Sequence, residues 1–248
     1  MTVAAVEVRD LSKAFGGLRA VNGVTLIVAP GERRALIGPN GAGKTTLFHC
    51  ITGTLRATSG EVKLNGHDVT HEPEYQRTKR GMGRTFQITN VFADLTLSDN
   101  MALAIMGTDR RKWVVGRPLS AFPAVREMVL TGLAAVGLRD RADEEVKYLS
   151  YGERRQLELA LALGTQPKVL FLDEPCAGLS PSERQRIFAM VRELPRDVTV
   201  VMIEHDMDVA LGIADRVTVM NRGEVMAEGT PAQVQADANV RDVYFGHA

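Results

Sequence analysis

The sequence predicts an α/β fold in which a mostly parallel sheet is interrupted by a helical insertion and accompanied by a small antiparallel sheet. Two observations predict it. Short β-type runs recur in the first and last thirds of the chain, whereas helical patterns dominate the middle. In addition, 45% of the 248 residues are hydrophobic, which suffices for a sizeable core and excludes a disordered chain.

The charge, the cysteine content and the lack of long apolar runs exclude several further classes of protein. Lys+Arg and Asp+Glu both number 30, so the chain lacks the positive excess that nucleic-acid binding favours. Two cysteines, Cys50 and Cys176, are too few for a disulfide framework or a zinc site. No apolar run approaches the roughly 18–20 residues that span a bilayer, and the N-terminus lacks a signal-peptide pattern. We expect a cytoplasmic protein that binds no nucleic acid and reaches a membrane only through a partner.

The first seventy residues are rich in predicted strands. The β-type runs lie at residues 6–8, 24–28, 34–37 and 61–64. Pro30-Gly31 is typical of a turn, and Asn65-Gly66 is typical of a hairpin. We therefore expect a small antiparallel sheet at the N-terminal edge of the fold.

The rest of the chain is predicted to be helical first and then alternating. The predicted helices lie at residues 98–106, 122–136, 152–163, 181–194 and 207–213. The nearly all-apolar runs at 169–172 and 198–203 are typical of buried parallel strands, and residues 217–227 form a second predicted hairpin. We expect one domain over residues 1–248, with a helical lobe at approximately 87–163 inserted in the α/β core.

A glycine-rich loop carries the first chemical motif. Residues 38–45 fit G-x-x-x-x-G-K-[ST], follow an apolar run and precede a helical stretch, as a phosphate-binding loop does. Backbone N–H groups and the helix N-terminus would hold phosphate oxygens, Lys44 would reach the β- and γ-phosphates, and the Thr45 hydroxyl would ligate Mg²⁺. The alternative is a glycine-rich turn with an unrelated lysine. The motif indicates a P-loop NTPase core, with these ATP-binding residues: Gly38, Pro39, Asn40, Gly41, Ala42, Gly43, Lys44, Thr45 and Thr46.

Two carboxylates end the predicted strand at 169–172. Ligands bind at the carboxyl ends of strands in open α/β sheets, so Asp173 and Glu174 are candidate site residues. Asp173 is expected to hold Mg²⁺, in part through water. Glu174 is expected to polarise a water molecule for in-line attack. The alternative is a solvated acidic turn.

A third motif leads to a family. Leu149-Ser150-Tyr151-Gly152-Glu153 begins a helical stretch, and Ser150 lies 23 residues before Asp173 (173 − 150). Together with the phosphate loop, it resembles the nucleotide-binding subunits of ABC transporters over essentially the whole chain. The resemblance implies that Ser150, Tyr151, Gly152 and Glu153 form a signature loop, which binds the γ-phosphate held by a second ATP-binding subunit.

The resemblance implies three further roles. Phe15 would stack on adenine, Gln87 would touch Mg²⁺ and the attacking water, and His205 would contact the γ-phosphate and order Glu174. The alternatives are a core phenylalanine, a surface glutamine and a structural histidine. Three residues depart from the common pattern: Tyr151 stands where many members have Gly, Glu153 where many have Gln, and Ser180 where many have Asp. Ser180 lacks the charge to pair across a dimer.

Several stretches resemble one branch of the family, the ATP-binding subunits of bacterial branched-chain amino acid importers. They are residues 15–21, 83–87, 203–207 and 243–246. The resemblance implies uptake of branched-chain or other hydrophobic amino acids, with urea, amides or aromatic acids as alternative solutes. It also implies transmembrane permease partners, an extracytoplasmic solute-binding protein acting indirectly, and a place on the cytoplasmic face of the inner membrane.

The permease contact is expected on the helical lobe. A groove there would use apolar side chains between residues 87 and 100: Ile88, Val91, Phe92, Leu95 and Leu97. These side chains could instead pack the lobe's own core. The basic–aromatic run 110–113 is a second candidate, for contact with lipid headgroups.

Two other classes of function stay open. One is an ABC-type ATPase of translation or DNA repair, and the other is a module that closes on ATP without hydrolysing it.

Overall fold

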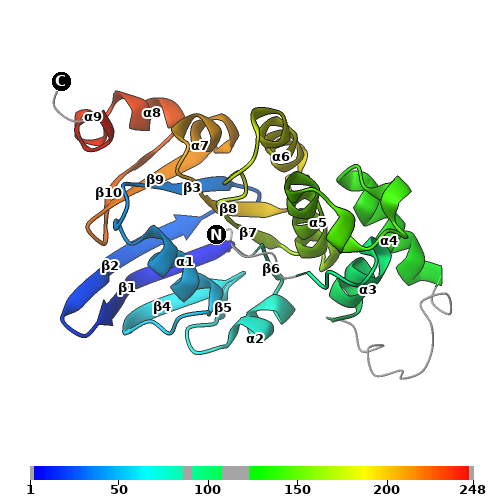
Figure 1. Cartoon of the computed structure of the whole chain (residues 1–248). Helices are drawn as coiled ribbons and strands as arrows, with labels where there is room; N and C mark the ends of the chain where they lie inside the picture. Colours follow the sequence, from blue (N-terminus) through cyan, green and yellow to red (C-terminus); the bar gives the residue numbers. More distant parts are fainter. Residues whose placement is uncertain (1–2, 86–90, 108–122, 246–248) are drawn as a thin grey trace. The chain divides into compact units, whose positions relative to one another are not determined.

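The computed structural model describes residues 3–85, 91–107 and 123–245, and the chain divides into two compact units (Figure 1). Unit 1 comprises Met1–Met82, Lys168–Glu174 and Leu194–Ala248. Unit 2 comprises Gly83–Pro167 and Pro175–Glu193. Unit 2 therefore includes a segment that lies well after residue 163 in the sequence. The single domain with a lobe at 87–163 stays a prediction.

The antiparallel sheet predicted at the N-terminal edge is present in unit 1. Its strand order is β2-β1-β4-β5, and all three pairings are antiparallel. The strands are β1 (Val6–Phe15), β2 (Leu18–Val28), β4 (Ser59–Leu64) and β5 (His67–Asp68). The first two are longer than predicted, because the hairpin continues through residues 9–23, where bulges and polar residues break the apolar alternation.

The second sheet has the order β10-β9-β3-β8-β7-β6. Strand β3 (Arg33–Ile37) pairs in parallel with β8 (Thr199–Ile203) and β9 (Arg216–Asn221), and β7 (Val169–Asp173) pairs in parallel with β8. The edge strand β10 (Glu224–Gly229) forms the predicted hairpin with β9, and β6 is Met82–Arg84. Every residue of β3, β7 and β8 is buried, which explains the apolar runs at 35–37, 169–172 and 200–203.

Five helices complete unit 1. They are α1 (Lys44–Thr52), α2 (Glu74–Lys79), α7 (Met207–Ile213), α8 (Pro231–Ala236) and α9 (Ala238–Phe245) among the described residues. The core of this unit includes side chains from both sheets and from α1. The rings of Phe48 and Phe171 meet edge-on, with centroids 5.5 Å apart, and join α1 to β7. This packing fastens α1 to the strand that ends at Asp173.

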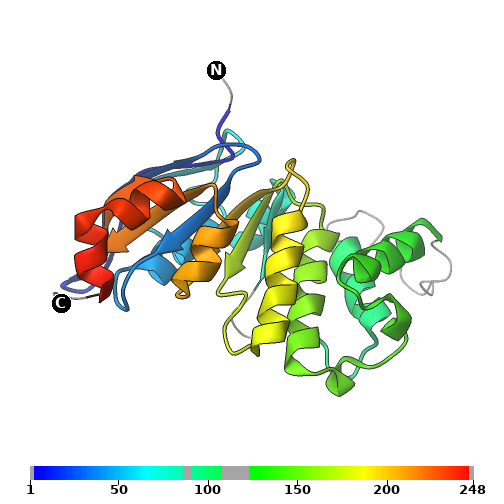
Figure 2. The ribbon, with the colours of Figure 1, turned by 90° about the horizontal axis from the view of Figure 1, so that it is seen from above.

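Unit 2 is helical. Its α-helices are α3 (Leu97–Gly107), α4 (Pro123–Ala135), α5 (Tyr151–Gly164) and α6 (Pro181–Glu193), and short 3₁₀ turns lie at Arg139–Arg141 and Val146–Tyr148. An apolar core joins α3, α4 and α5. Figure 2 shows α5 and α6 side by side, which agrees with the contacts between them. The helices predicted from the sequence are thus confirmed to within about two residues at each end, as assignments of helix ends commonly vary.

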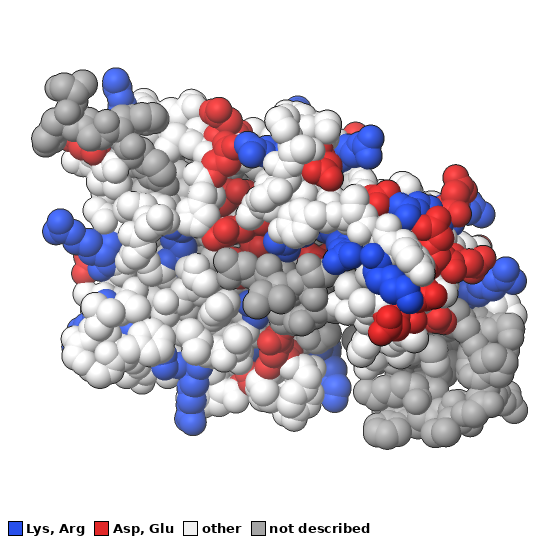
Figure 3. All heavy atoms as spheres, in the orientation of Figure 1, with Lys and Arg blue, Asp and Glu red and all other residues white. Residues whose placement is uncertain are grey.

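Charged side chains of both signs share the described surface. On the face seen in Figure 3, Lys and Arg are interspersed with Asp and Glu. Among the described residues, ion pairs join Arg216 to Glu228 and Arg80 to Glu72. Positive and negative side chains are therefore not segregated on the face in Figure 3.

Candidate active site

The predicted phosphate loop lies between β3 and α1 in unit 1. Gly38 and Gly43 have φ angles of 151° and 96°, which side-chain-bearing residues rarely adopt. A Cβ on Gly38 would overlap the carbonyl oxygen of Met220, and one on Gly43 would overlap that of Ala20. The loop can therefore keep this tight path only with glycine at both positions.

Lys44 is folded back over this loop. Its Nζ donates hydrogen bonds to the carbonyl oxygens of Gly38 at 2.7 Å and Pro39 at 3.0 Å. The residue is 4% exposed, and burial lowers the pKa of its ammonium, while the negative charge of Glu174 opposes that shift. A buried ammonium at a helix N-terminus is arranged to attract an anion.

Glu174 and His205 form a pair at the ends of neighbouring strands. The His205 Nε2 lies 2.6 Å from Glu174 Oε1, and because a carboxylate only accepts, the imidazole nitrogen donates. The Glu174 N–H donates to the carbonyl oxygen of Ile203 at 3.1 Å. Glu174 has a φ of 48°, in the left-handed region that costs a non-glycine residue roughly 1–3 kcal/mol and is concentrated at functional sites.

Asp173 is the last residue of β7 and is 1% exposed. His49 Nε2 lies 3.7 Å from its Oδ2. Residues four apart on a helix share a face, so Thr45 and His49 lie on the same side of α1, toward Asp173. Sequence reasoning missed His49, although its i+4 spacing from Thr45 was a usable signal.

Topology brings these residues to one edge of the sheet. β3, β8 and β7 are adjacent and parallel, so their carboxyl ends meet. The phosphate loop follows β3, His205 follows β8, and Asp173 ends β7 with Glu174 directly after it. Residues far apart in the sequence are thus collected at the edge where ligands bind in open α/β sheets.

Phe15 ends β1 and is 48% exposed, which rules out the alternative of a core phenylalanine. The Lys13 ammonium lies 5.0 Å from the centroid of its ring. The hairpin that carries Phe15 reaches the phosphate loop, since the Ala20 carbonyl lies against Gly43. An exposed ring beside a phosphate loop is available for stacking.

The signature loop predicted at residues 150–153 begins α5 in unit 2. Ser150 is the N-cap of this helix. The Glu153 N–H donates to Ser150 Oγ at 3.3 Å, and the Ser150 N–H donates to Glu153 Oε2 at 2.8 Å. Glu153, which departs from the common glutamine, therefore completes a capping box. Burial disfavours its charge, but hydrogen bonds from Ser150 and Arg141 outweigh this effect and lower the pKa of Glu153.

The predicted permease groove is only partly described. Gln87, Ile88 and residues 110–113 lie outside the described residues. Leu97 is fully buried and Val91 packs on the core of unit 2. These two side chains therefore follow the alternative that they pack the lobe's own core. Phe92 and Leu95 are 61% and 37% exposed, and buried Asn100 bonds to the backbone N–H and carbonyl of Phe92.

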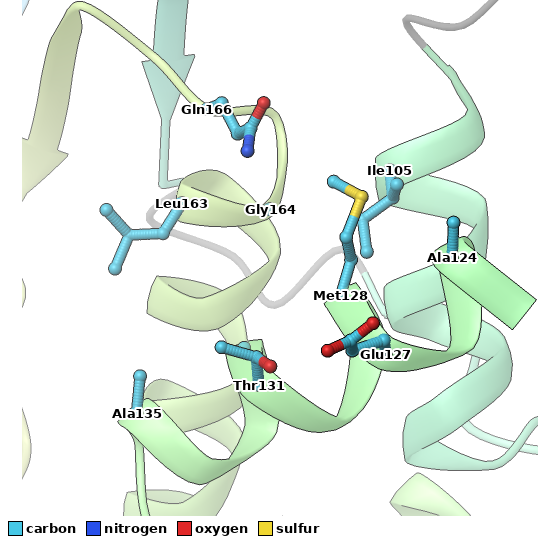
Figure 4. A pocket seen from close by; sticks show the side chains of 10 residues that line it. Ile105, Ala124, Glu127, Met128, Thr131, Ala135, Leu163, Gly164 and Gln166 are labelled. Carbon is cyan, nitrogen blue, oxygen red and sulfur yellow. The ribbon is translucent and has the colours of Figure 1, made fainter.

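A hollow of about 480 Å³ opens between α3, α4 and the end of α5 (Figure 4). Met128 of α4 and Ile105 of α3 lie side by side in its lining. Gly132 and Gly164 also line it, and their lack of a side chain adds to its volume. Of the described residues that line it, Glu127 is the charged one. Sequence reasoning did not predict this hollow, and its lining lacks the charged groups gathered at the sheet edge.

No cluster of three or more His, Cys, Asp or Glu side chains suited to a metal ion occurs in the described part of the chain. Nor does any helix described there have the length and apolar character that a membrane crossing requires.

Comparisons with known families agree with this geometry. The family described as ABC transporter matches residues 21–177, and the one described as branched-chain amino acid ATP-binding cassette transporter matches residues 224–248. The high-affinity branched-chain amino acid transport ATP-binding proteins BraF of Pseudomonas aeruginosa and LivG of Escherichia coli are each 38% identical to this chain. In both cases 98% of each sequence is covered.

Solved structures show the same fold. A crystal structure of an ATP-binding cassette of an ABC transporter in its ADP conformation aligns with a TM-score of 0.84 and 31% identity, covering 99% of this chain and all of that one. A nucleotide-free cassette aligns with a TM-score of 0.82 and 30% identity, covering 98% of this chain. The similarity extends over both units of the chain.

Proposed function

Because this chain belongs to the ABC transporter family as a nucleotide-binding ATPase subunit, we propose that it drives the uptake of branched-chain or other hydrophobic amino acids. The observation that carries the proposal is the sheet edge where the phosphate loop, Glu174 and His205 meet. The substrate class rests on the two relatives and on the C-terminal match at residues 224–248.

The nucleotide would bind at residues 38–46. The Lys44 ammonium would exchange the carbonyls of Gly38 and Pro39 for the β- and γ-phosphate oxygens of ATP. The N-terminus of α1, with Thr45 and Thr46 in its first turn, would add backbone N–H groups. Phe15 would stack on the adenine with its exposed face.

The donor set fits Mg²⁺. This ion prefers oxygen ligands and is usually held by one or two carboxylates together with substrate phosphates. The Thr45 hydroxyl and the Asp173 carboxylate supply such oxygens at the same edge of the sheet, and Gln87 is proposed as a further contact. When bound, the ion would neutralise charge that develops on the phosphates.

Hydrolysis would use the pair at the strand ends. The Glu174 carboxylate would orient a water molecule in line with the γ-phosphate and take up its proton. His205 would hold Glu174 through the 2.6 Å hydrogen bond and would contact the γ-phosphate. The hydrogen bond from His205, and the bond from the Glu174 N–H to the Ile203 carbonyl, would hold this residue at the end of β8.

A complete site would need a second ATP-binding subunit, identical or different. Residues 150–153 at the start of α5 would bind the γ-phosphate held by that subunit, because the Ser150 hydroxyl can donate to it and the dipole of the helix N-terminus favours an anion. Two subunits would thus close head to tail around two ATP molecules. A single chain would then be a poor ATPase.

Transport would require membrane permeases. The exposed side chains of Phe92 and Leu95 are the described residues proposed to contact them. The chain would therefore be a peripheral subunit on the cytoplasmic face of the inner membrane, and a solute-binding protein outside would act indirectly.

Purification of the complex from native membranes in mild detergent tests this function. We expect two polytopic permeases and a second ATP-binding subunit to accompany the chain. Recovery of soluble partners alone would contradict the transport role. Stimulation of ATP hydrolysis in that complex by urea or an aromatic acid, and not by leucine, would contradict the proposed substrate class.

A further inference from the structure

Tyr151 joins the signature loop to the segment that follows Glu174. Its hydroxyl donates to the carbonyl oxygen of Ala177 at 3.3 Å. Its ring also lies against Gly178, where a Cβ would be in van der Waals contact with it, at 3.4 Å from the ring carbon Cε1. Both partners belong to unit 2, as Tyr151 does. The residue that departs from the common glycine thus touches the loop between Glu174 and α6.

Arg155 fixes the direction of that hydrogen bond. Its Nη2 and Nε donate to the Tyr151 hydroxyl at 3.0 Å and 3.3 Å. A guanidinium can only donate, so the hydroxyl oxygen accepts from it and its hydrogen is directed to Ala177. Arg155 is itself held by Glu158 at 3.0 Å, and both side chains are buried.

A second contact fastens the same two segments. The Glu183 carboxylate accepts from the Ser180 N–H at 2.9 Å and from the Ser180 hydroxyl at 2.6 Å. It also accepts from the Gly152 N–H and lies so close to Gly152 that a Cβ there would overlap it. Ser180, which stands where many family members have an aspartate, therefore forms its hydrogen bonds within its own chain.

The loop that Tyr151 contacts follows directly after Glu174 in the sequence. The boundary between the two compact units falls between Glu174 and Pro175. Ala177 is thus three residues from the catalytic carboxylate but belongs to the unit that carries the signature loop. Tyr151 therefore connects residues 150–153 to the stretch of chain that leads directly back to Glu174.

We propose that Tyr151 is a positioning residue that links engagement of the partner-held γ-phosphate to the placement of Glu174 in its own site. The proposal rests on the function proposed above. When the Ser150 hydroxyl binds the phosphate of the second subunit, the Tyr151 hydroxyl carries the Ala177 carbonyl with it. This contact within one chain takes the place of the charged pair that Ser180 cannot make.

The first test measures ATP hydrolysis of the full chain carrying Tyr151→Phe, which removes the hydroxyl and keeps the ring. We expect kcat to fall about fivefold, the factor that one ordinary net hydrogen bond provides, with KM for ATP changed less than twofold. The matched control is Tyr148→Phe, which deletes the hydroxyl of a tyrosine that is 67% exposed. It should leave both constants unchanged. A wild-type kcat in Tyr151→Phe would overturn the proposal.

The second test separates positioning from phosphate binding. The fraction of protein that forms a dimer with ATP is measured by size-exclusion chromatography for Glu174→Gln alone and for Glu174→Gln combined with Tyr151→Phe. We expect equal dimer formation, because the hydroxyl acts on the placement of residue 174 and not on the nucleotide. Loss of the dimer together with a raised KM would overturn the proposal. If Glu174→Gln alone forms no dimer with ATP, the proposed function itself fails.

Discussion

Glu174 combines a left-handed backbone with a short hydrogen bond to His205. Replacing it with glutamine keeps the size of the side chain and removes its ability to accept a proton. We expect Glu174→Gln to bind ATP as the wild type does, and its steady-state turnover to fall at least about 100-fold, the lower range for a general base. Phosphate release and equilibrium ATP binding measure the two effects. Glu193→Gln, an exposed substitution at the end of α6, is the control, and normal turnover in Glu174→Gln would contradict the assignment.

Lys44 is the charged group of the phosphate loop. A hydrogen bond to a charged group contributes about 1.5–3 kcal/mol, so we expect Lys44→Ala to weaken ATP binding at least about tenfold. Lys63→Ala is a suitable control, since Lys63 lies on β4 and pairs loosely with Glu61 at 3.9 Å. Equilibrium binding of a fluorescent ATP analogue measures both variants. Unchanged affinity in Lys44→Ala would rule out the phosphate-loop role.

Glu183 makes a pH-dependent contribution to stability. Hydrogen bonds from Ser180 and from the Gly152 N–H lower the pKa of its carboxyl below the ordinary value of 4.5. A lowered folded-state pKa stabilises the fold at pH values above the ordinary one, and this stabilisation is lost as the pH falls through the lowered pKa. We expect Glu183→Gln to melt at a lower temperature than wild type at pH 7, with the difference shrinking below pH 4.5. A difference that does not change with pH would show that the carboxylate charge contributes nothing.

At the scale of elements, the C-terminus of α1 depends on a residue of α2. The buried Arg77 guanidinium donates to the carbonyl oxygens of Cys50 at 2.9 Å and Ile51 at 2.5 Å. Its positive charge also suits the negative end of the helix dipole. This contact holds the far end of the helix that begins with Lys44.

Arg77→Met keeps much of the side-chain volume and leaves those two carbonyls without the guanidinium. We expect the free energy of unfolding to fall by about 2–6 kcal/mol, since each of the two buried unsatisfied groups costs about 1–3 kcal/mol. Urea denaturation measures it. Arg80→Met, which removes an exposed arginine paired with Glu72, should change the midpoint little. Equal effects of the two substitutions would mean that the cap does not stabilise α1.

The long elements could be predicted from the sequence and several short ones could not. Strands β3, β7 and β8 contain the apolar runs 35–37, 169–172 and 200–203, and α5 begins with a capping box at Ser150. Helix α2 has six residues, one of them buried, so it shows no apolar periodicity. Helix α8 was also missed, although Thr230, Pro231 and Gln233 form a recognisable start signal.

At the scale of the whole molecule, most of the candidate site residues could be proposed from the sequence because each lies in a motif or follows a strand end. The parallel order of β3, β8 and β7 then brought Lys44, Glu174 and His205 together, as sheet topology requires. The contact of Tyr151 with Ala177 could not be predicted in this way. It joins two loops whose approach is set by the packing of α5 on α6, and no local pattern encodes that packing.

The central claim is that ATP hydrolysis by this chain drives solute import, and uptake by a reconstituted transporter tests it most directly. The complex purified from native membranes would be placed in liposomes with the solute-binding protein and radiolabelled leucine on the side opposite the ATP-binding subunits. We predict leucine accumulation that requires ATP and is abolished when the chain carries Glu174→Gln. Accumulation that is equal without ATP, or equal in the Glu174→Gln complex, would contradict the account.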